Sequence, residues 1–224
     1  LHRISAGTVT GGGLLAKVRG AWSLFRGTRE ARVLLRRLRP DVVVGFGGYP
    51  TVPPLYAAAT SGVPTIIHEA NAVMGRANNF LAPKVRRIAT GFPLRDARWP
   101  DKTIVTGNPV RPPVLEAART PFPAWDGHLK LLVTGGSQGA RVMSEVVPAA
   151  VALLSANDRI RLDLTQQARP EDIERVGQVY RTLGVAAELR PFFADLPARI
   201  AGAHLVIGRA GASPCAELSV ICRP

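Results

Sequence analysis

The stretch that most constrains the fold is a short apolar run followed by a glycine-rich turn and a helical pattern, residues 130–141. The apolar run predicts a buried strand, and Gly135 and Gly136 allow a sharp turn and the close approach of a ligand to the backbone. A helix that begins directly after such a turn points backbone N–H groups at an anion. Ser137 can cap this helix or donate its hydroxyl to a phosphate oxygen. The pattern therefore predicts either a phosphate-binding turn or a capped turn without a ligand.

The second half of the chain alternates strand and helix patterns. Strands are predicted at 129–134, 160–165, 186–190 and 204–207, and helices at 140–154, 171–183, 195–201 and from about residue 212. This alternation is typical of a parallel sheet with helices on both faces.

The first half shows a similar pattern with a more basic start. Strands are predicted at 41–44, 64–68, 85–89 and 103–106, and helices at 14–26, 29–39, 53–61 and 75–82, with a break at Gly27 and Thr28. The proline-rich span 107–125 predicts a domain boundary, which gives domains 1–112 and 113–224. Because the chain begins without Met and stops just after a helical pattern, we expect both domains to be incomplete.

The charge of the chain is strongly uneven. The net charge is +13, and residues 1–40 hold nine Lys and Arg against one Glu. Such asymmetry indicates an anionic partner: nucleic acid, a phosphate-bearing substrate or a membrane surface. The helix at 14–26 is either packed in the core with a solvated basic face or interfacial, with Leu14, Trp22, Phe25 and Arg26 at the membrane. Nucleic acid is disfavoured, since the aromatic residues are few and not interleaved for base stacking.

Several other classes are disfavoured by simple counts. The two cysteines, Cys215 and Cys222, form neither a CxxC motif nor a disulfide framework, so we expect free thiols in a reducing compartment. The four histidines show no metal-ligand spacing, and no apolar run reaches about 18 residues. We therefore expect neither a bound metal nor a membrane-spanning helix.

Polar residues follow predicted strands at two further places. His68, Glu69 and Asn71 follow one strand, and Glu217 stands one helical turn after Ser213. Ligands of open α/β sheets bind outside the carboxyl ends of strands, where a carboxylate could accept both hydroxyls of a ribose. The alternatives are a core histidine, a helix cap and a solvent-exposed carboxylate. Glycine turns in both halves, joined by a proline-rich segment, predict a cleft that holds a phosphate-bearing ligand.

Five segments in order carry a resemblance to a known family. They are 45–49 (Gly-Phe-Gly-Gly-Tyr), 68–71 (His-Glu-Ala-Asn), 107–111 (Gly-Asn-Pro-Val-Arg), 135–141 (Gly-Gly-Ser-Gln-Gly-Ala-Arg) and, more loosely, 209–217. Together they resemble the MurG family of N-acetylglucosaminyltransferases, glycosyltransferase family 28, along essentially the whole chain.

The resemblance implies two Rossmann-like α/β domains of the GT-B type. It implies an inverting transfer of N-acetylglucosamine from UDP-N-acetylglucosamine to lipid I, which forms lipid II in peptidoglycan synthesis, without a metal or other cofactor. It also implies a peripheral protein on the cytoplasmic face of the bacterial inner membrane. The implied partners are the two substrates, an anionic membrane surface and other cell-wall synthesis and division proteins, with no nucleic acid.

The resemblance also implies roles for individual residues, carried over motif by motif. The donor would be bound by Asn71, Arg111, Gly136, Ser137, Gln138, Gly139, Ala140, Ala194, Ala212, Ser213 and Glu217. The acceptor side of the cleft would be lined by Gly48, Tyr49 and His68, and Glu69 is a possible proton acceptor.

Three departures from the family pattern bear on catalysis. The sequence has no Gly-Gly-Thr-Gly-Gly-His loop with its general-base histidine, and the sugar-reading glutamines are absent too. The last motif has Ala212-Ser213-Pro214 where the family usually has Leu-Thr. We therefore expect the isolated chain to be inactive. The alternatives are another GT-B enzyme that uses a UDP-sugar, such as a glycolipid transferase or an epimerase, and a non-catalytic module that binds a nucleotide or a membrane.

Overall fold

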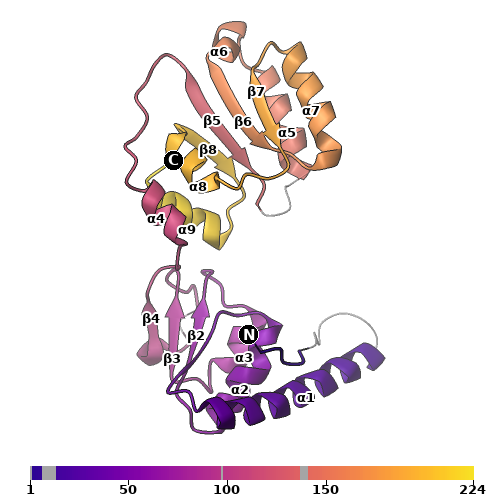
Figure 1. Ribbon diagram of the computed structural model, residues 1–224, viewed down its shortest axis with the longest axis vertical. Helices are drawn as coiled ribbons and strands as arrows, with labels where there is room; N and C mark the ends of the chain where they lie inside the picture. Colours follow the sequence, from indigo (N-terminus) through magenta and orange to yellow (C-terminus); the bar gives the residue numbers. More distant parts are fainter. Residues whose placement is uncertain (1, 7–13, 97, 137–140) are drawn as a thin grey trace. The chain divides into compact units, whose positions relative to one another are not determined.

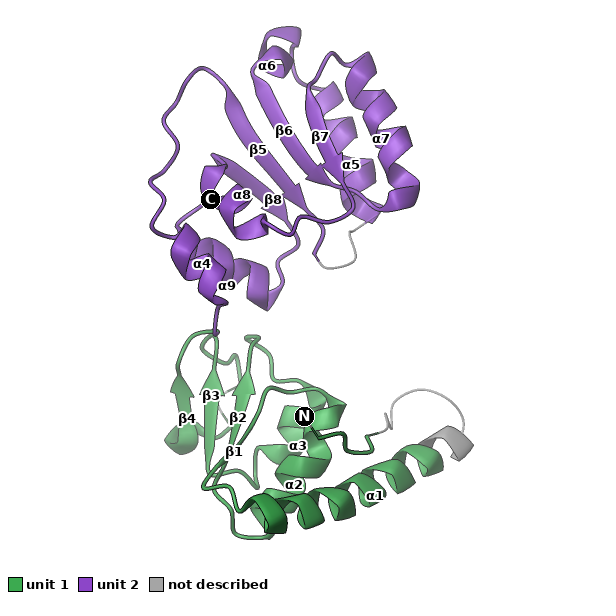
Figure 2. Ribbon diagram, in the orientation of Figure 1, with its two compact units in different colours: residues 1–108 green, residues 109–224 purple. Residues whose placement is uncertain are grey.

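The computed structural model describes residues 2–6, 14–96, 98–136 and 141–224. The chain folds as two compact units, residues 1–108 and residues 109–224 (Figure 1, Figure 2). This division falls a few residues before the predicted boundary at 112, so that Arg111 belongs to the second unit and not to the first.

The first unit contains a parallel sheet whose strands follow the chain order. They are β1 (Val43–Gly45), β2 (Thr65–Glu69), β3 (Arg87–Thr90) and β4 (Thr103–Val105). Two helices, α2 (Val52–Thr60) and α3 (Arg76–Leu81), pack on the sheet around a buried apolar core that includes Leu55, Ile67 and Ile88. Short 3-10 turns lie at Tyr49–Thr51 and Pro100–Lys102. The predicted strands are confirmed, with ends shifted by one or two residues.

The basic segment near the amino terminus forms one continuous helix, α1 (Leu14–Leu38), so the predicted break at Gly27 and Thr28 is wrong. The Thr28 hydroxyl does not cap a second helix, because it donates to the Leu24 carbonyl one turn earlier at 2.8 Å. Gly27 is buried, and a Cβ at this position would lie 1.8 Å from the carbonyl oxygen of Ser5. The glycine therefore serves a close approach between segments and does not end the helix.

Helix α1 buries small residues and exposes large apolar ones. Gly27 and Ala31 lie on its buried side, and α1 packs against α2. Trp22 and Phe25 are 68% and 60% exposed, and their ring centroids lie 5.8 Å apart. This is the reverse of the arrangement in an ordinary amphipathic helix of a soluble domain. Helix α1 therefore packs on the core, but through its small residues and Leu24, while Trp22 and Phe25 stay outside the core. Within the described part of the chain, no helix is both long and apolar enough to cross a bilayer.

The second unit is a parallel sheet covered on both faces, as predicted. Its strands are β5 (Leu129–Thr134), β6 (Leu162–Gln167), β7 (Ala187–Arg190) and β8 (Leu205–Gly208), in the order β7-β6-β5-β8. Helices α5 (Arg141–Ala152) and α7 (Pro170–Thr182) cover one face, and α4 (Pro112–Ala117), α8 (Leu196–Gly202) and α9 (Ala212–Ile221) cover the other (Figure 1). Alternate residues of β5 point to opposite faces of the sheet. Leu131 and Val133 therefore join the core under α5 and α7, and Leu132 joins the core under α4, α8 and α9.

Two helices of this unit were not predicted. Helix α4 lies inside the proline-rich span that was assigned to a linker, and its two prolines occupy its first positions, where proline is tolerated. Helix α6 (Ala156–Ile160) is a single turn capped by Ser155, whose side chain accepts a hydrogen bond from the Asp158 N–H. Both are too short to show a hydrophobic period in the sequence.

Candidate functional site

The carboxyl ends of the second sheet form a topological switch point. From β5 the chain proceeds through α5 to β6 and then to β7 on one side, whereas β8 pairs with the other side of β5. The loops that leave β5 and β8 therefore lead in different directions, and the crevice between such loops is where open α/β sheets bind ligands.

A cavity of about 540 Å³ lies at these strand ends. Residues that follow different strands line it: Gly136 after β5, Phe193 and Ala194 after β7, and Ser213 and Glu217 after β8. The other lining residues are Pro109, Arg111, Gln167, Phe192, Leu196 and Pro214. Gly136 has a φ of +85°, a left-handed conformation that only glycine adopts without strain. The structure thus gathers predicted donor residues from four separate segments around one cavity.

Arg111 and Glu217 form an ion pair within this lining. The Nη2 atom of Arg111 lies 3.1 Å from Oε1 of Glu217. The side chain of Glu217 is only 13% exposed, whereas that of Arg111 is 64% exposed. Arg111 is also the residue that directly precedes α4, which explains why it belongs to the second unit. The pair places one positive and one negative group at a cavity otherwise lined largely by apolar and backbone groups.

Six other residues were predicted to bind the donor. Ala212 is the first residue of α9, next to Ser213. Asn71 lies in the first unit. Ser137, Gln138, Gly139 and Ala140 lie outside the described residues. Among the residues that the structure describes, no group of three or more His, Cys, Asp or Glu side chains is arranged to hold a metal ion.

Sequence reasoning missed Gln166 and Gln167, because the predicted strand ended at residue 165. Strand β6 continues through both glutamines, which are buried. Gln167 lines the cavity, and Gln166 points to the opposite face of the sheet, where its Nε2 donates to the Met143 carbonyl at 3.2 Å. Polar side chains at the carboxyl end of an apolar run were the available signal.

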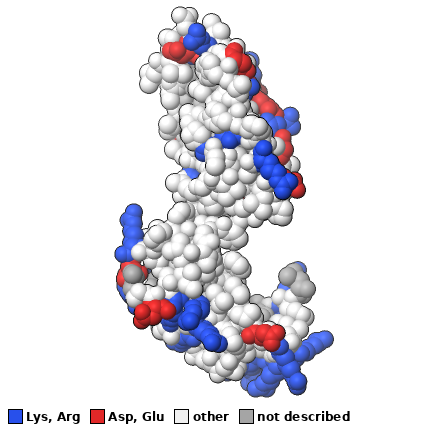
Figure 3. Space-filling model, turned by 90° about the vertical axis from the view of Figure 1, so that its left-hand side faces the viewer, with Lys and Arg blue, Asp and Glu red and all other residues white. Residues whose placement is uncertain are grey.

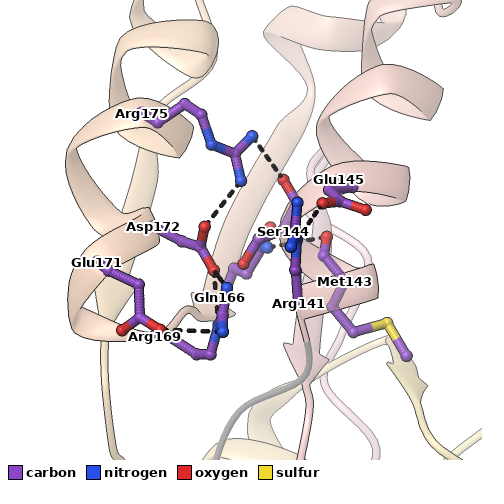
Figure 4. A network of polar contacts seen from close by, with 9 residues as sticks. All are labelled: Arg141, Met143, Ser144, Glu145, Gln166, Arg169, Glu171, Asp172 and Arg175. Atoms are coloured by element: carbon purple, nitrogen blue, oxygen red, sulfur yellow. Dashed lines mark hydrogen bonds and ion pairs between the residues drawn. The ribbon is translucent and has the colours of Figure 1, made fainter.

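A polar network fixes the first turns of α5 and α7 (Figure 4). Arg175 donates to an Asp172 carboxylate oxygen at 2.9 Å and to the Ser144 carbonyl at 3.4 Å, and Arg169 pairs with Asp172 at 2.8 Å. The hydrogen bond from Arg175, with that from Arg169, outweighs burial and lowers the pKa of Asp172. The Tyr180 hydroxyl donates to Gln166 Oε1 at 2.5 Å, and burial raises the pKa of this phenol. The network links α7 to α5, the helix that follows the glycine turn.

A second cavity, of about 330 Å³, lies at the carboxyl ends of the first sheet. It is lined by residues 46–49, 69–71 and 75–78, so Gly48, Tyr49, Glu69 and Asn71 border the same space. His68 is 7% exposed, and its Nε2 lies 3.1 Å from the Gly107 carbonyl oxygen. Of the residues predicted for the acceptor side, Gly48 and Tyr49 line this cavity, whereas the buried His68 does not.

Both carboxylate oxygens of Glu69 are used in hydrogen bonds to neighbouring residues. Its Oε1 accepts hydrogen bonds from the backbone N–H and side-chain Nδ2 of Asn71, and its Oε2 accepts from the Gly75 N–H and Asn78 Nδ2, at 2.8 to 3.1 Å. Burial raises the pKa of the Glu69 carboxyl, but these hydrogen bonds outweigh burial and leave its pKa below the ordinary value. The carboxylate therefore orders the loop that carries Asn71. Its role as a proton acceptor stays a prediction that this geometry does not favour.

A hollow of about 720 Å³ runs along α1 and is here called the α1 groove. Phe25, Val33, Tyr56 and Phe80 form apolar walls, and three arginines of α1 line it as well: Arg29, Arg32 and Arg36. Residues 1–108 hold sixteen Lys and Arg against five Asp and Glu. Figure 3 shows groups of basic side chains on this unit, with acidic side chains beside some of them. This surface combines exposed aromatic rings with positive charge.

Comparisons with known proteins assign the family. One family model, the glycosyltransferase family 28 N-terminal domain, matches residues 1–90, and a second, the glycosyltransferase family 28 C-terminal domain, matches residues 130–224. The chain belongs to glycosyltransferase family 28. The family resemblance expected from the five sequence motifs is confirmed.

Curated proteins with a shared name are similar over the whole chain. A Brucella suis protein (strain ATCC 23445 / NCTC 10510) is named UDP-N-acetylglucosamine--N-acetylmuramyl-(pentapeptide) pyrophosphoryl-undecaprenol N-acetylglucosamine transferase. It is 55% identical over 227 residues, a match that covers 100% of this family 28 chain and 60% of the relative. The protein of the same name from Brucella canis (strain ATCC 23365 / NCTC 10854 / RM-666) matches with the same identity and coverage. The chain thus spans about 60% of the length of these relatives.

Solved structures confirm the two-unit α/β fold of the GT-B type. The crystal structure of Acinetobacter baumannii MurG matches with a TM-score of 0.72 at 26% identity, covering 97% of this chain and 59% of that chain. The UDP-GlcNAc 2-epimerase from Neisseria meningitidis, solved bound to UDP-GlcNAc, matches with a TM-score of 0.62 at 14% identity, covering 94% and 64%. The second likeness concerns the fold alone, so it does not decide between a transferase and an epimerase within this fold.

Proposed function

We propose that this protein transfers N-acetylglucosamine from UDP-N-acetylglucosamine to lipid I. The observation that carries the proposal is the cavity of the second unit, which gathers Arg111, Gly136, Ala194, Ser213 and Glu217 at a switch point of the sheet. The names of the Brucella relatives support the choice of donor and acceptor.

In the proposed reaction, the C4 hydroxyl oxygen of the acceptor forms a bond to the anomeric carbon of the donor sugar. The bond from that carbon to the β-phosphate oxygen breaks, UDP leaves, and the hydroxyl proton passes to a base. Negative charge grows on the departing diphosphate, so a fixed cation beside it stabilises the transition state more than the ground state. We assign this role to Arg111, whose exposed guanidinium lies at the cavity, and we propose that Glu217 accepts hydrogen bonds from the ribose hydroxyls.

The first unit is proposed to receive the acceptor. Gly48 and Tyr49, both predicted for the acceptor side, border its cavity. Asn71, predicted for the donor, borders the same cavity, and Glu69 holds the loop of Asn71 in place through four hydrogen bonds. The transfer is proposed to need no metal ion, since a helix start and Arg111 can stabilise the diphosphate. Excess EDTA should therefore leave the transfer rate unchanged, and a loss restored by Mg²⁺ would contradict this part of the proposal.

Nucleotide binding and transfer are tested separately. Calorimetry measures the affinity of this chain for UDP and UDP-N-acetylglucosamine. Transfer is measured with a lipid I analogue and radiolabelled donor, in this chain and in a protein extended to the length of the Brucella relatives. Lipid-linked radiolabel with release of UDP supports the transferase, whereas conversion of the donor sugar without UDP release supports an epimerase. Absence of UDP binding contradicts the proposal as a whole.

We further propose that the α1 groove and the adjoining Trp22 and Phe25 bind the anionic surface of the inner membrane from its cytoplasmic face. The exposed aromatic rings would enter the headgroup layer, and Arg29, Arg32 and Arg36 would contact lipid phosphates. Sedimentation with liposomes tests this. Binding to liposomes that contain phosphatidylglycerol but not to neutral ones supports the proposal, and equal or absent binding to both contradicts it.

A further inference from the structure

Gln167 joins three segments that line the cavity of the second unit. Its Oε1 accepts hydrogen bonds from the Thr134 hydroxyl at 3.1 Å and from the Gly135 N–H at 3.2 Å. Its Nε2 donates to the Pro191 carbonyl at 3.1 Å. The side chain is 4% exposed and borders the cavity. One amide therefore connects the start of the glycine turn, the end of β6 and the loop between β7 and α8.

The chemistry of these bonds requires a primary amide. The oxygen must accept two hydrogen bonds while the nitrogen donates one, and glutamine supplies both groups. An apolar side chain of similar length would leave the Gly135 N–H and the Pro191 carbonyl without this partner in a buried place, which is unfavourable. The two backbone groups would then have to move toward other partners or toward water. Such a movement changes the separation of the glycine turn from the loop that carries Phe193 and Ala194.

We infer that Gln167 is a positioning residue that sets this separation and thereby the affinity of the cavity for a nucleoside diphosphate. The inference rests on the proposed function, in which the donor nucleotide occupies the cavity lined by Gly136 and Ala194. Gln167 need not touch the nucleotide, because its hydrogen bonds act on the backbone at both ends of the cavity. Small displacements of binding groups have large effects on affinity, which is why supporting hydrogen bonds matter.

The chain offers a matched control in the preceding residue. Gln166 is 0% exposed and also uses both ends of its amide, but toward Met143 and Tyr180 on the opposite face of the sheet. Gln166→Met and Gln167→Met both remove a buried amide from the end of β6, so both should destabilise the fold. Only Gln167→Met removes a link between segments that line the cavity.

The test measures the affinity of the chain for UDP by calorimetry and its stability by thermal unfolding. We expect Gln167→Met to raise the Kd for UDP about tenfold and Gln166→Met to leave it within about twofold at a similar loss of stability. In the extended protein, Gln167→Met should raise KM for the donor with kcat nearly unchanged. Equal Kd values for wild type and Gln167→Met, or an equal rise in Gln166→Met, would overturn the inference.

A milder variant keeps the inference testable if Gln167→Met does not fold. Thr134→Val removes one of the two donors to Gln167 Oε1 and should raise the Kd for UDP by about threefold. Where both variants fold, the double variant should lose less UDP affinity than the sum of the two single losses, because the two side chains share a hydrogen bond, although the Thr134 hydroxyl also accepts from the Gly136 N–H at 3.5 Å. Unchanged UDP affinity in Thr134→Val, or fully additive losses, counts against the inference. A wild-type chain that binds no UDP contradicts the proposed function, and with it the inference, whereas a binding wild type with unaffected variants contradicts the inference alone.

Discussion

The Nη2 atom of Arg111 donates a hydrogen bond to Oε1 of Glu217 at 3.1 Å, which joins the residue before α4 to the middle of α9. Both residues line the cavity of the second unit. Because the arginine is 64% exposed, such a pair adds only about 0–1 kcal/mol to stability. We therefore expect the pair to contribute to ligand binding more than to stability. It places a positive group for the diphosphate and a negative group for the ribose hydroxyls of a nucleotide at the same cavity.

The first prediction follows from this exposure. Arg111→Ala should weaken UDP binding by about tenfold to a hundredfold, since a charge-assisted contact to a phosphate is worth about 1.5–3 kcal/mol. Its melting temperature should change by no more than about 4 °C. Calorimetry and thermal unfolding measure the two effects.

Arg181→Ala is the control for loss of an arginine. Arg181 is 60% exposed and pairs with Glu174 on α7, away from the cavity lining. The Arg181→Ala variant should bind UDP with unchanged affinity. If Arg111→Ala and Arg181→Ala weaken binding equally, the effect is one of net charge and not of this site.

The proximity of Gly136, Ser213 and Glu217 could be predicted from strand patterns and glycine turns, whereas Arg111 and Ala194 were assigned to the same site by the family resemblance alone. Parallel strands bring their carboxyl ends to one edge, so order along the chain is enough to predict proximity. The contribution of Gln167 could not be predicted, because it depends on hydrogen bonds to backbone groups of two neighbouring segments. Such partners are set by strand order and register, which one sequence does not reveal.

The misassigned helix break has a similar origin. Glycine ordinarily disfavours a helix interior, so Gly27 followed by Thr28 was interpreted as an end and a new start. Glycine is needed there because a Cβ would clash with the carbonyl oxygen of Ser5, a residue far away in the sequence. Glu69 illustrates the same limit at the site, because its four donors come from the loop after β2 and from α3.

The second prediction concerns the aromatic pair on α1. Trp22→Ala combined with Phe25→Ala should lower binding to liposomes containing phosphatidylglycerol by at least about tenfold, since two large exposed rings lose their contact with the headgroup layer. Sedimentation at constant ionic strength measures the bound fraction. Stability should be almost unaffected, because both rings are already exposed in the fold.

Trp125→Ala combined with Phe122→Ala is the control for that experiment. These rings are 63% and 54% exposed, but they belong to the second unit and do not line the α1 groove. Liposome binding should persist in this variant. Equal losses in both double variants would mean that exposed aromatic area, and not the α1 surface, determines the binding.

The third prediction concerns the pH dependence of stability. The pKa of Glu69 lies below its ordinary value of 4.5, because hydrogen bonds to the ionised form outweigh burial. A carboxyl whose pKa is lower in the folded state stabilises the fold above the unfolded pKa, and this contribution is lost as the pH falls through the folded pKa. Glu69→Gln should therefore lower the free energy of unfolding by about 1–3 kcal/mol at pH 7 and by less below pH 4.

Denaturant unfolding between pH 7 and pH 3 measures this difference. Glu174→Gln is the matched control, since its side chain is 91% exposed and it removes the same charge. The free energy of unfolding of that variant should follow the wild type across the range. A gap between wild type and Glu69→Gln that stays constant with pH would mean that ionisation of Glu69 does not contribute to stability.

The fourth prediction separates two glycines that both lie inside helices. Alanine is more favourable than glycine in a helix interior by about 1 kcal/mol, so Gly-to-Ala substitutions in open places stabilise. Gly177 of α7 is less open but can accommodate a methyl group, because a Cβ there would lie 3.2 Å from the flexible end of Arg181 and 3.4 Å from Leu189 Cδ1, both of them side-chain atoms. Gly177→Ala should therefore be neutral or stabilising by up to about 1 kcal/mol.

Gly27→Ala should have the opposite effect, although its helix is longer. The added Cβ would lie 1.8 Å from the Ser5 carbonyl oxygen, a backbone atom, so the segment that carries Ser5 must move away from α1. That movement also breaks the hydrogen bonds from the Ser5 backbone N–H and hydroxyl to the Glu30 carboxylate, at 2.8 and 3.0 Å. Thermal unfolding should show a lower melting temperature for Gly27→Ala and an equal or higher one for Gly177→Ala. A stabilised Gly27→Ala would mean that the contact with Ser5 does not hold in solution, and α1 would then be free of the amino-terminal segment.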